Sequence, residues 1–501
     1  YYGNQQFLFV YEQFDDVRLV AAPPSSIGKF GGDTDNWIWP RHTGDFSMFR
    51  VYASKDNRPA AYSPQNVPYR PKKHFSISTK GVKEGDFTMI YGFPGNTQEY
   101  ILSDAVAYIA ERSDPAKIAV RTGRLDIITK AQESDPALRI HYAAKHASIA
   151  NAWKKWQGEA LGIDRRGTVA AKFDYETQFG LWSVGRPEYA GVVMGLRAEY
   201  DRIMDAYFAY EITRETLSTL PAAYTPEERA EECFARRKFA EQALWRHAFR
   251  EYGRCPKVYR TPSYAEGMAR YKSPEAYADA LFEAVWEGSD SVAMQPAVRL
   301  REETKRMLDH ISWMLGTKSL RNLNSKILNE LYTTYIKGLR EWDRERAFYP
   351  DANLTLRVAY GSVAGYEYAD GEYHKPQTTL DGIIAKDNPE IYDYDIPQSL
   401  RDLYASKNYG RWGTVIDGRR TVPVCFLATN HTTGGNSGSP VLNAGGELIG
   451  INFDRTWRST MSDIAFDPAI CRNIAVDIRY VLFVVDRVGG AGYLLKEMTL
   501  K

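Results

Sequence analysis

A long helical stretch interrupts a chain whose two ends have the pattern of β-strands, and this interruption limits the folds that the chain can form. Between about Asp104 and Arg346, apolar residues recur with helical spacing in segments rich in Ala, Glu, Arg and Leu. Thr225-Pro226-Glu227-Glu228 and Ser273-Pro274 are typical of helix starts, because a capping side chain precedes a proline in the first turn. The pattern predicts a β-domain divided by helices, with segments 1–103, 104–350 and 351–501.

Short apolar runs bounded by Pro, Gly, Asp and Asn predict the strands on either side of the helices. The runs before the helices are FLFVYEQF, DVRLVAA, DFSMFRVYA and DFTMIYGF, and those after them are LTLRVAYGSV, TVPVCFLAT, SPVLN, ELIGINF and YVLFVVD. Helices inserted in a loop of a β-scaffold commonly cover a site. We therefore expect the helical block to act as a cap.

Composition excludes several classes of partner. The 501 residues are 44% hydrophobic and 25% charged, which is ordinary for a globular chain with room for more than one domain. A formal net charge of +1 argues against nucleic acid as the main partner. The sequence contains no run of 18 apolar residues, so no membrane span is predicted. The four cysteines lack C-x-x-C spacing, so a zinc site is not expected, although one or two disulfides are compatible with their number. No motif indicates a metal, nucleotide or flavin, and no cofactor is predicted.

The segment TTGGNSGSPVLNAGGELIGINFDRTW, residues 432–457, contains the candidate nucleophile. Glycine is favoured where the backbone turns sharply or approaches a ligand closely. GNSGSP resembles the nucleophile loop of chymotrypsin-like serine peptidases, in which two backbone amides bind the oxyanion of the tetrahedral intermediate. In this sequence the nucleophile would be Ser437, and the amides would be those of Gly435 and Ser437.

Another serine motif, the G-x-S-x-G elbow of α/β-hydrolases, does not fit this segment. The acid and histidine of that motif follow the serine, whereas no histidine follows His431 here and Ser439 occupies the second glycine position. Ser439 precedes Pro440, and we interpret it as a turn residue rather than as a second nucleophile.

Two similar upstream segments offer a catalytic aspartate. GDFSMF contains Asp45 and GDFTMI contains Asp86. The chymotrypsin-like order places the acid before the serine, and the second segment continues into YGFPG, which is similar to the strand that opens the second barrel in this fold. We predict that Asp45 is the acid and that Asp86 is a turn residue. The helical block accounts for the long separation between Asp45 and Ser437.

No histidine of this sequence suits the triad. The base should precede Asp45, and only His42 does, three residues away on what reads as one strand, where the two side chains would face opposite sides. His431 is too close to Ser437 to come from the opposite barrel. The sequence begins at Tyr1 without an initiator Met or a leader, so we expect that it was cut from a larger protein. The catalytic base would then lie upstream of Tyr1, and these residues alone should have little activity. Surface or core polar roles are expected for His74, His141, His146, His247, His310 and His374.

Three longer motifs carry a more specific resemblance. DVRLVAAPPSSIGKFGGDTDNWIWPRHTGDFSMFRVY, NAWKKWQG and TTGGNSGSPVLNAGGELIGINFDRTW look like those of the bacterial serine dipeptidyl peptidases, the family of dipeptidyl-peptidases 7 and 11. The resemblance extends along the whole chain, which looks like the C-terminal two-thirds of such a protein. It implies a β + α fold, namely a chymotrypsin-like double β-barrel, incomplete in its first barrel, with an inserted α-helical cap. Asp45 and Ser437 match the family's acid and nucleophile.

The resemblance also implies a site for the free N-terminus of a peptide, from which the family releases dipeptides. Asn36 and Trp37 match residues that line this site, and Asn151 and Asp454 match residues that bind the α-amino group. A carboxylate with an amide oxygen is a natural ligand for an ammonium group. Without the resemblance, Asn151 would be interpreted as a solvated helix residue, and Trp37 could equally belong to the core.

Arg455 is the residue most informative about substrate choice. It ends the run ELIGINF, where chymotrypsin-like folds build the wall of the pocket for the residue before the scissile bond. A guanidinium there would pair with a carboxylate, and in the family an arginine at this position marks the Asp/Glu-selective branch. Asp454 and Arg455 would face opposite sides of a regular strand, so both can serve the site only if the strand bulges.

The resemblance implies peptide partners with a free N-terminus, a periplasmic location and a homodimer. Two other functions are compatible with the same fold. The first is an endopeptidase that uses its helices as a platform for a partner. The second is an inactive peptide-binding relative.

Overall fold

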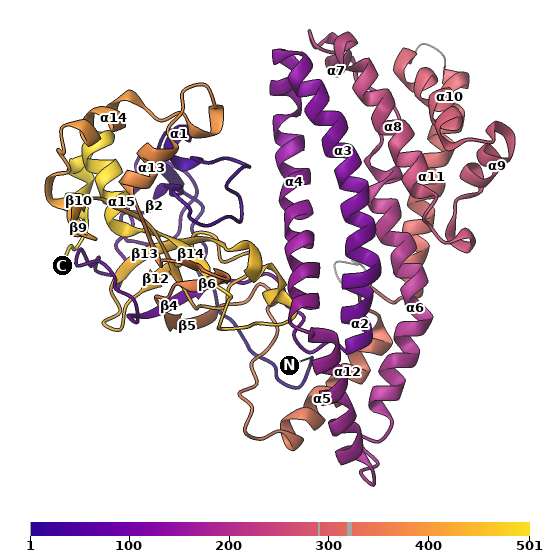
Figure 1. The fold of residues 1–501 in the computed structure, drawn as a ribbon, viewed down its shortest axis with the longest axis horizontal. Coiled ribbons are helices and arrows are strands. Elements are labelled where there is room, and N and C mark those ends of the chain that lie inside the picture. Colours follow the sequence, from indigo (N-terminus) through magenta and orange to yellow (C-terminus); the bar gives the residue numbers. More distant parts are fainter. Residues whose placement is uncertain (1, 289–290, 318–322) are drawn as a thin grey trace. The chain divides into compact units, whose positions relative to one another are not determined.

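The structure is a computed structural model that describes residues 2–288, 291–317 and 323–501. Its contacts divide the chain into two compact units (Figure 1). The helical unit comprises the first residues through Gln5 and the segment Tyr100–Pro350, and the β unit comprises Gln6–Glu99 and Asp351–Lys501. The chain is therefore a mixed α and β protein in which one inserted segment supplies nearly all of the helical unit.

Two long helices form the framework of the helical unit. α3 (Asp114–Ser134) and α4 (Pro136–Arg165) run side by side (Figure 1). The chain reverses at Asp135, whose carboxylate accepts a hydrogen bond of 2.8 Å from the Ala137 amide and so caps α4. Apolar side chains of α3, α4 and α8 (Lys238–Tyr252) pack together between them. The other helices are α2 (Ser103–Ala107), α5 (Thr168–Ser183), α6 (Val192–Glu215), α7 (Pro226–Ala230), α9 (Pro262–Tyr271), α10 (Pro274–Glu287), α11 (Ser291–Met314) and α12 (Lys326–Trp342).

Both helix starts predicted from the sequence are confirmed. The Thr225 hydroxyl accepts from the Glu228 amide at the start of α7, and the Glu228 carboxylate accepts from the Thr225 amide, which completes a capping box. The Ser273 hydroxyl accepts from the Ala276 amide at the start of α10. These local signals are readable in the sequence because each involves residues within one turn of helix.

Antiparallel sheets form the framework of the β unit. The largest has the order β5-β4-β12-β13-β14-β11-β8, and a three-stranded sheet has the order β1-β2-β3. Two hairpins, β6-β7 and β9-β10, complete the described pairings. The strands are β1 (Val17–Ala21), β2 (Met48–Ala53), β3 (Val67–Pro68), β4 (Phe87–Gly92), β5 (Arg357–Ser362), β6 (Tyr366–Ala369), β7 (Glu372–His374), β8 (Gln377–Thr379), β9 (Thr414–Ile416), β10 (Arg419–Thr421), β11 (Pro423–Ala428), β12 (Pro440–Leu442), β13 (Leu448–Arg455) and β14 (Asn473–Asp477).

Strands from before and after the helical insertion pair directly. β4 lies between β5 and β12, with Met89 opposite Tyr360 on one side and Leu442 on the other. The large apolar core of the β unit also receives the short helices α1 (Ser25–Gly28), α13 (Leu380–Lys386), α14 (Gln398–Ala405) and α15 (Ile478–Phe483). The two β segments of the sequence therefore fold as one body.

Two strand predictions are wrong, and several short strands were not predicted. The run FLFVYEQF forms no strand, and its residues Phe7–Tyr11 are exposed. The run YVLFVVD is helical and begins within α15, where the Asp477 carboxylate caps the first turn by accepting from the Arg479 amide. A short apolar run buried on all sides does not distinguish a strand from a buried helix. Among the strands that were not predicted is β14, which pairs with β13 and β11.

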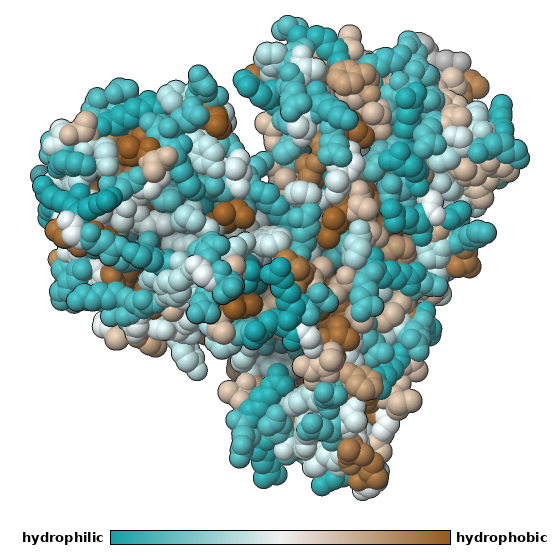
Figure 2. Space-filling view, in the orientation of Figure 1, coloured by the Kyte–Doolittle hydropathy of each residue, from teal (hydrophilic) through white to brown (hydrophobic). Residues whose placement is uncertain are grey.

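The visible surface is mainly hydrophilic, with hydrophobic residues in small scattered groups (Figure 2). In the described part of the chain, no helix is both long and apolar enough to cross a membrane. The cysteines are buried free thiols, so the disulfides that the sequence left open are not formed by these residues: Cys233, Cys255, Cys425 and Cys471.

Candidate active site

The loop before β12 holds Ser437 in a sharply turned backbone. Gly435 has a φ of +103°, and a Cβ there would come within 2.3 Å of the Phe93 carbonyl oxygen, so only glycine fits. The loop is closed by hydrogen bonds from the Asn436 amide to the Thr433 carbonyl (3.0 Å) and from the Gly438 amide to the Asn452 carbonyl (2.8 Å). The glycines of this segment thus serve a tight turn that presents one serine.

The amides around Ser437 suit an oxyanion. Ser437 is exposed, and its Oγ donates to the Phe453 carbonyl at 3.3 Å. Among the residues that the structure describes, neither the Gly435 amide nor the Ser437 amide donates to a protein acceptor, although their neighbours in the loop do. Two unpaired amides beside an exposed hydroxyl are the elements needed to stabilise a tetrahedral intermediate of acyl transfer.

Asp45 lies just before β2, with its residue surface partly open to solvent. Burial of the carboxylate by the surrounding protein raises its pKa; the Arg41 guanidinium opposes that rise and the Asp454 carboxylate adds to it. Asp45 therefore shares its electrostatic environment with Arg41 and Asp454. The near-copy Asp86 is a turn residue, as predicted, because its Oδ2 accepts from the Lys83 amide at 2.7 Å.

Arg41 organises the site, although no local pattern in the sequence singles it out. Its Nη1 donates to Asp454 Oδ2 at 2.7 Å and to the Asp35 carbonyl at 2.9 Å, and its Nε donates to the Thr43 hydroxyl at 2.6 Å. The two paired side chains are 9% and 11% exposed. Asp454 is therefore held in place by a largely buried ion pair, which joins segments far apart in the sequence and could not be located without the fold.

Replacing Arg41 with Met should destabilise the β unit, because removal of one partner leaves the other charge buried and unpaired. We expect a loss of about 3 kcal/mol in the free energy of unfolding, measured as a lower urea midpoint of the transition of the β unit. Arg58 is the matched control, since its pair with Asp56 is exposed at both ends, and Arg58→Met should cost less than about 1 kcal/mol. Equal midpoints for the two variants would contradict a structural role for the Arg41–Asp454 pair.

A β-bulge precedes Asp454. Asn452 lies opposite Ala475 and Asp454 opposite Ile474, so Phe453 is an extra residue in β13. The Asp454 side chain reaches Arg41, and its Oδ1 accepts from the Arg455 amide at 2.8 Å. The bulge lies before both residues, and the pairing of Asp454 with Ile474 and of Arg455 with Asn473 is regular, so it does not bring their side chains to one side of the strand.

The Arg455 guanidinium is buried and already paired. Nη1 and Nη2 donate to the two carboxylate oxygens of Asp463 at 2.6 and 2.8 Å, and Nη1 also reaches the Ser462 hydroxyl and the Thr432 carbonyl. The ring of Trp37 lies 5.6 Å from its central carbon. Asp463 was not singled out in the sequence, because nothing in its local pattern shows that it faces Arg455.

A loop tied down by Asp35 carries Asn36 and Trp37. The Asp35 carboxylate accepts from Lys386 Nζ at 2.7 Å and from the Tyr394 hydroxyl at 2.9 Å. Trp37 has a φ of +67°, which is costly for a residue with a side chain. The structure thus brings Asn36 and Trp37 into the same unit as Ser437, whereas Asn151 is an exposed residue of α4 in the helical unit.

The two histidines considered for the triad, His42 and His431, contact other parts of the β unit. His42 lies outside any strand, contrary to the sequence interpretation, and packs so closely on Gly382 of α13 that a Cβ there would be 2.0 Å from its Nε2. Its burial and the nearby Lys386 and Arg41 lower its pKa to about 3. His431 Nε2 bonds to the Ser462 carbonyl at 2.8 Å, and its ring stacks on Phe466.

One group of potential metal ligands lies in the helical unit. His141, Glu231 and Cys233 place a ligand atom each within 4.8 Å of one another. The Arg237 guanidinium is 2.7 Å from His141 Nε2 and 3.1 Å from Glu231 Oε2. Since a cationic side chain already occupies the space between these ligands, the group is accounted for as an ion-pair cluster.

Comparisons with known proteins match the whole chain. The profile of the family described as Peptidase S46 matches residues 1–233 and 227–500. An Asp/Glu-specific dipeptidyl-peptidase of Capnocytophaga gingivalis is 43% identical over 100% of this chain and 75% of its own length, and a dipeptidyl-peptidase 7 of Phocaeicola vulgatus is 35% identical over 100% and 74%. The crystal structure of Porphyromonas endodontalis DPP11 in complex with the dipeptide Arg-Glu is 34% identical, with a TM-score of 0.81 over 97% of this chain and 75% of that one.

Proposed function

Because the chain belongs to the peptidase S46 family, we propose that it is a serine dipeptidyl peptidase that releases dipeptides from free peptide N-termini and prefers Asp or Glu as the second residue. Ser437 Oγ attacks the carbonyl carbon that follows this second residue. The oxyanion then accepts hydrogen bonds from the Gly435 and Ser437 amides, and Asp45 orients the histidine that takes the serine proton. The location of that histidine outside these 501 residues stays a prediction.

The observation that carries this proposal is the pair of unpaired amides at Ser437. A Gly/Ser turn with only a structural role would be expected to use its amides within the loop, as Asn436 and Gly438 do. Donors fixed in advance toward the developing charge contribute about 3 to 4 kcal/mol each to transition-state stabilisation in serine peptidases. This arrangement favours acyl transfer over simple peptide binding.

The substrate ammonium group is assigned to Asp454. Each Asp454 oxygen has one protein donor, Arg41 or the Arg455 amide, and retains a lone pair for a further donor. A carboxylate held in this way can fix the distance between the free N-terminus and Ser437, which sets the length of the product at two residues. Asn36 and Trp37 line the N-terminal part of the site, and a role for Asn151 in binding the ammonium group stays a prediction.

Arg455 is assigned to the carboxylate of the second residue. Its pairing with Asp463 holds the guanidinium in one orientation, which lowers the entropy cost of receiving a substrate carboxylate. The same pairing partly neutralises the guanidinium, so the selection of acidic over amide side chains depends on the fixed geometry of its donors as well as on charge. Asp463 is thus a positioning residue for substrate selection.

Replacing Arg455 with Gly should lower kcat/KM for substrates with Asp or Glu second by about ten- to a hundredfold relative to Leu, which corresponds to one charge-assisted hydrogen-bonded pair. The measurement is kcat/KM for dipeptide substrates that differ only at this residue. Because Asp463 would lose its two hydrogen bonds from Arg455, the double variant Arg455→Gly/Asp463→Asn separates selectivity from folding. Arg458→Gly is the control, since the Arg458 guanidinium stacks on Tyr368 instead. This variant should rank the substrates by kcat/KM in the same order as the unsubstituted protein. An unchanged ranking in both Arg455 variants would remove Arg455 from the pocket.

We further propose that the large sheet closes into the second of two chymotrypsin-like barrels. An isolated bridge between Val363 and Ala428 and hydrogen bonds from Ala364 to Leu427 (3.2 Å) and from Thr429 to Ser362 (2.9 Å) link the ends of β5 and β11, which supports closure. In this proposal, 1–103 and 351–501 form the peptidase domain and 104–350 forms its cap. The homodimer and the periplasmic location stay predictions.

A further inference from the structure

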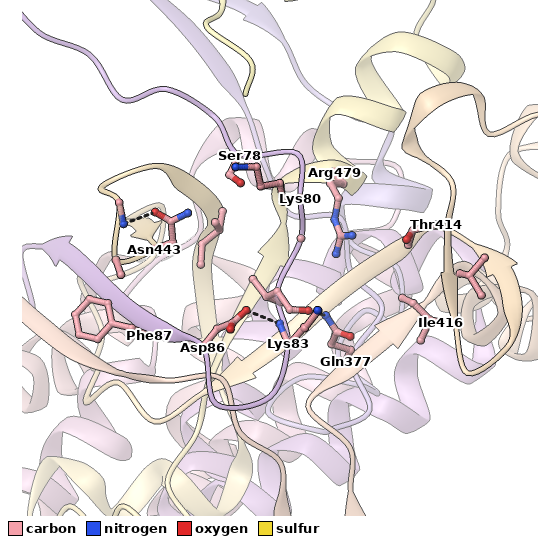
Figure 3. Close-up of a pocket in the computed structure, with 16 residues that line it drawn as sticks. Ser78, Lys80, Lys83, Asp86, Phe87, Gln377, Thr414, Ile416, Asn443 and Arg479 are labelled. Carbon is pink, nitrogen blue, oxygen red and sulfur yellow. Dashed lines mark hydrogen bonds between the residues drawn. The ribbon is translucent and has the colours of Figure 1, made fainter.

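A pocket of about 660 Å³ lies in the β unit at the turn between β12 and β13 (Figure 3). Its walls come from the loop Ser78–Lys83, the start of β4, the hairpin strand β9, the turn Asn443–Gly445 and the start of α15. Ser437 precedes β12 and Arg455 ends β13, so the turn is at the opposite end of this hairpin. At 3.3 Å per residue, the length of β13 separates the pocket from the candidate active site by about 20 Å.

Arg479 is the fixed polar group of this pocket. Its side chain is 7% exposed, and its Nε and Nη2 donate to the two Asp477 oxygens at 2.9 and 2.7 Å. Among the described residues, no protein acceptor pairs with Nη1, and Figure 3 shows the guanidinium directed into the pocket. Gly81, with a φ of +83°, lets the backbone approach so closely that a Cβ there would be 2.2 Å from Nη1. A buried arginine with one unused nitrogen facing a cavity is a donor without an acceptor of its own.

The charges around Arg479 favour an anion. Asp477 balances Arg479, and Lys80 and Lys83 on the pocket wall outnumber Asp86, whose Oδ2 accepts from the Lys83 amide. Glu447, beside the wall, interacts with Lys80 and also pairs with Lys501. Of the other polar side chains of the wall, Gln377 donates to the Val82 carbonyl and Asn443 donates to Glu447. The donors available to a ligand are thus Arg479 Nη1, two flexible ammonium groups and the hydroxyls of Ser78 and Thr414.

Apolar side chains complete the wall. Phe87, which is 41% exposed, and Ile416 lie on opposite sides of the pocket (Figure 3), and Val415, next to Ile416 in β9, is 66% exposed. The excess positive charge is small, which suits a singly charged carboxylate better than a doubly charged phosphate. Exposed apolar groups next to the cationic donors suit the side chains of a peptide that carries this carboxylate.

We propose that this pocket is an exosite that binds the carboxylate of a peptide, with Arg479 Nη1 as the fixed donor, Lys80 and Lys83 as the closing charges, and Phe87 and Val415 as the contact for an adjoining apolar residue. Binding here is distinct from catalysis at Ser437. A peptide with a blocked N-terminus and no acidic side chain therefore binds without use of Asp454 or Arg455.

The experiment titrates the intact protein with N-acetyl-Gly-Leu-Ala by saturation-transfer NMR and compares the peptide acid with its C-terminal amide. We expect the acid to bind, and the amide, Lys80→Gln/Lys83→Gln and Arg479→Lys each to weaken binding at least about tenfold. Lys55→Gln, a change at an exposed lysine elsewhere in the β unit, should leave the affinity unchanged.

Three outcomes would overturn the proposal. They are absence of binding by the acid, equal binding of acid and amide, and unchanged affinity in the double lysine variant, which tests the pocket even if Arg479→Lys misfolds. In competition, acetate should displace the peptide at lower concentration than inorganic phosphate at the same ionic strength. The reverse order would overturn the assignment to a carboxylate.

Discussion

The Ser437→Ala variant of the protein, as its gene encodes it, should lose about a million-fold in kcat for dipeptide release. Removal of a triad nucleophile costs this much in subtilisin, where the residual rate comes from the oxyanion hole and substrate binding. The change should barely affect folding, because Ser437 is exposed and its hydroxyl makes one long hydrogen bond to the Phe453 carbonyl. Steady-state kinetics with a chromogenic dipeptide ester or amide give the rate.

Ser439 is the matched control for Ser437. It lies two residues away in the same loop, is buried against Gly92, and uses its backbone rather than its hydroxyl to pair with Asn436 and Asn452. Ser439→Ala should therefore retain kcat within about tenfold and react with a fluorophosphonate label, whereas Ser437→Ala should not. Labelling that is lost in the Ser439 variant and kept in the Ser437 variant would exchange the two assignments.

The second large effect is expected for Asp45→Asn, which should lower kcat by about 10⁴-fold. In the chymotrypsin-like triad, the corresponding amide holds the histidine in the wrong tautomer and cannot stabilise the imidazolium. Since burial raises the pKa of Asp45, its ionised form is lost at a higher pH than that of an ordinary aspartate. The acid limb of kcat/KM against pH should reflect this shift and change in the variant.

Asp86→Asn is the control for Asp45, because the two residues stand in near-identical sequence contexts. In the described part of the chain, the Asp86 side chain accepts from the Lys83 amide at a turn, so its replacement should change kcat by less than about tenfold. A loss of 10³-fold or more in Asp86→Asn, with Asp45→Asn nearly unchanged, would mean that the upstream segment was assigned to the wrong aspartate.

The sequence predicted the parts of the fold that depend on neighbouring residues. The helical insertion, the helix starts before α7 and α10, and the strands on both sides of the insertion follow from local periodicity and turn residues. It failed where tertiary burial decides the structure. The run YVLFVVD is helical, because a fully buried apolar segment can satisfy its backbone hydrogen bonds either as a strand or as a helix. The exposed segment Phe7–Tyr11 forms no strand.

The candidate site divides in the same manner. Ser437 and Gly435 were proposed because a nucleophile loop needs glycine at fixed positions, and Asp45 because of the chain order of the triad; their catalytic roles stay predictions. Arg41 and Asp463 could not be predicted, because each acts through a partner whose proximity arises only in the fold: Arg41 pairs with Asp454 from the far end of the sequence, and Asp463 faces Arg455 across a turn.

A mass-spectrometric time course on one peptide with Glu at its second and fourth positions, offered with a free and with an acetylated N-terminus, distinguishes dipeptide release from internal cleavage. We expect the free peptide to lose two dipeptides in succession, each ending in Glu, and the acetylated copy to stay intact. Internal fragments from both peptides, formed at similar rates, would contradict this expectation and would favour an endopeptidase on the same scaffold.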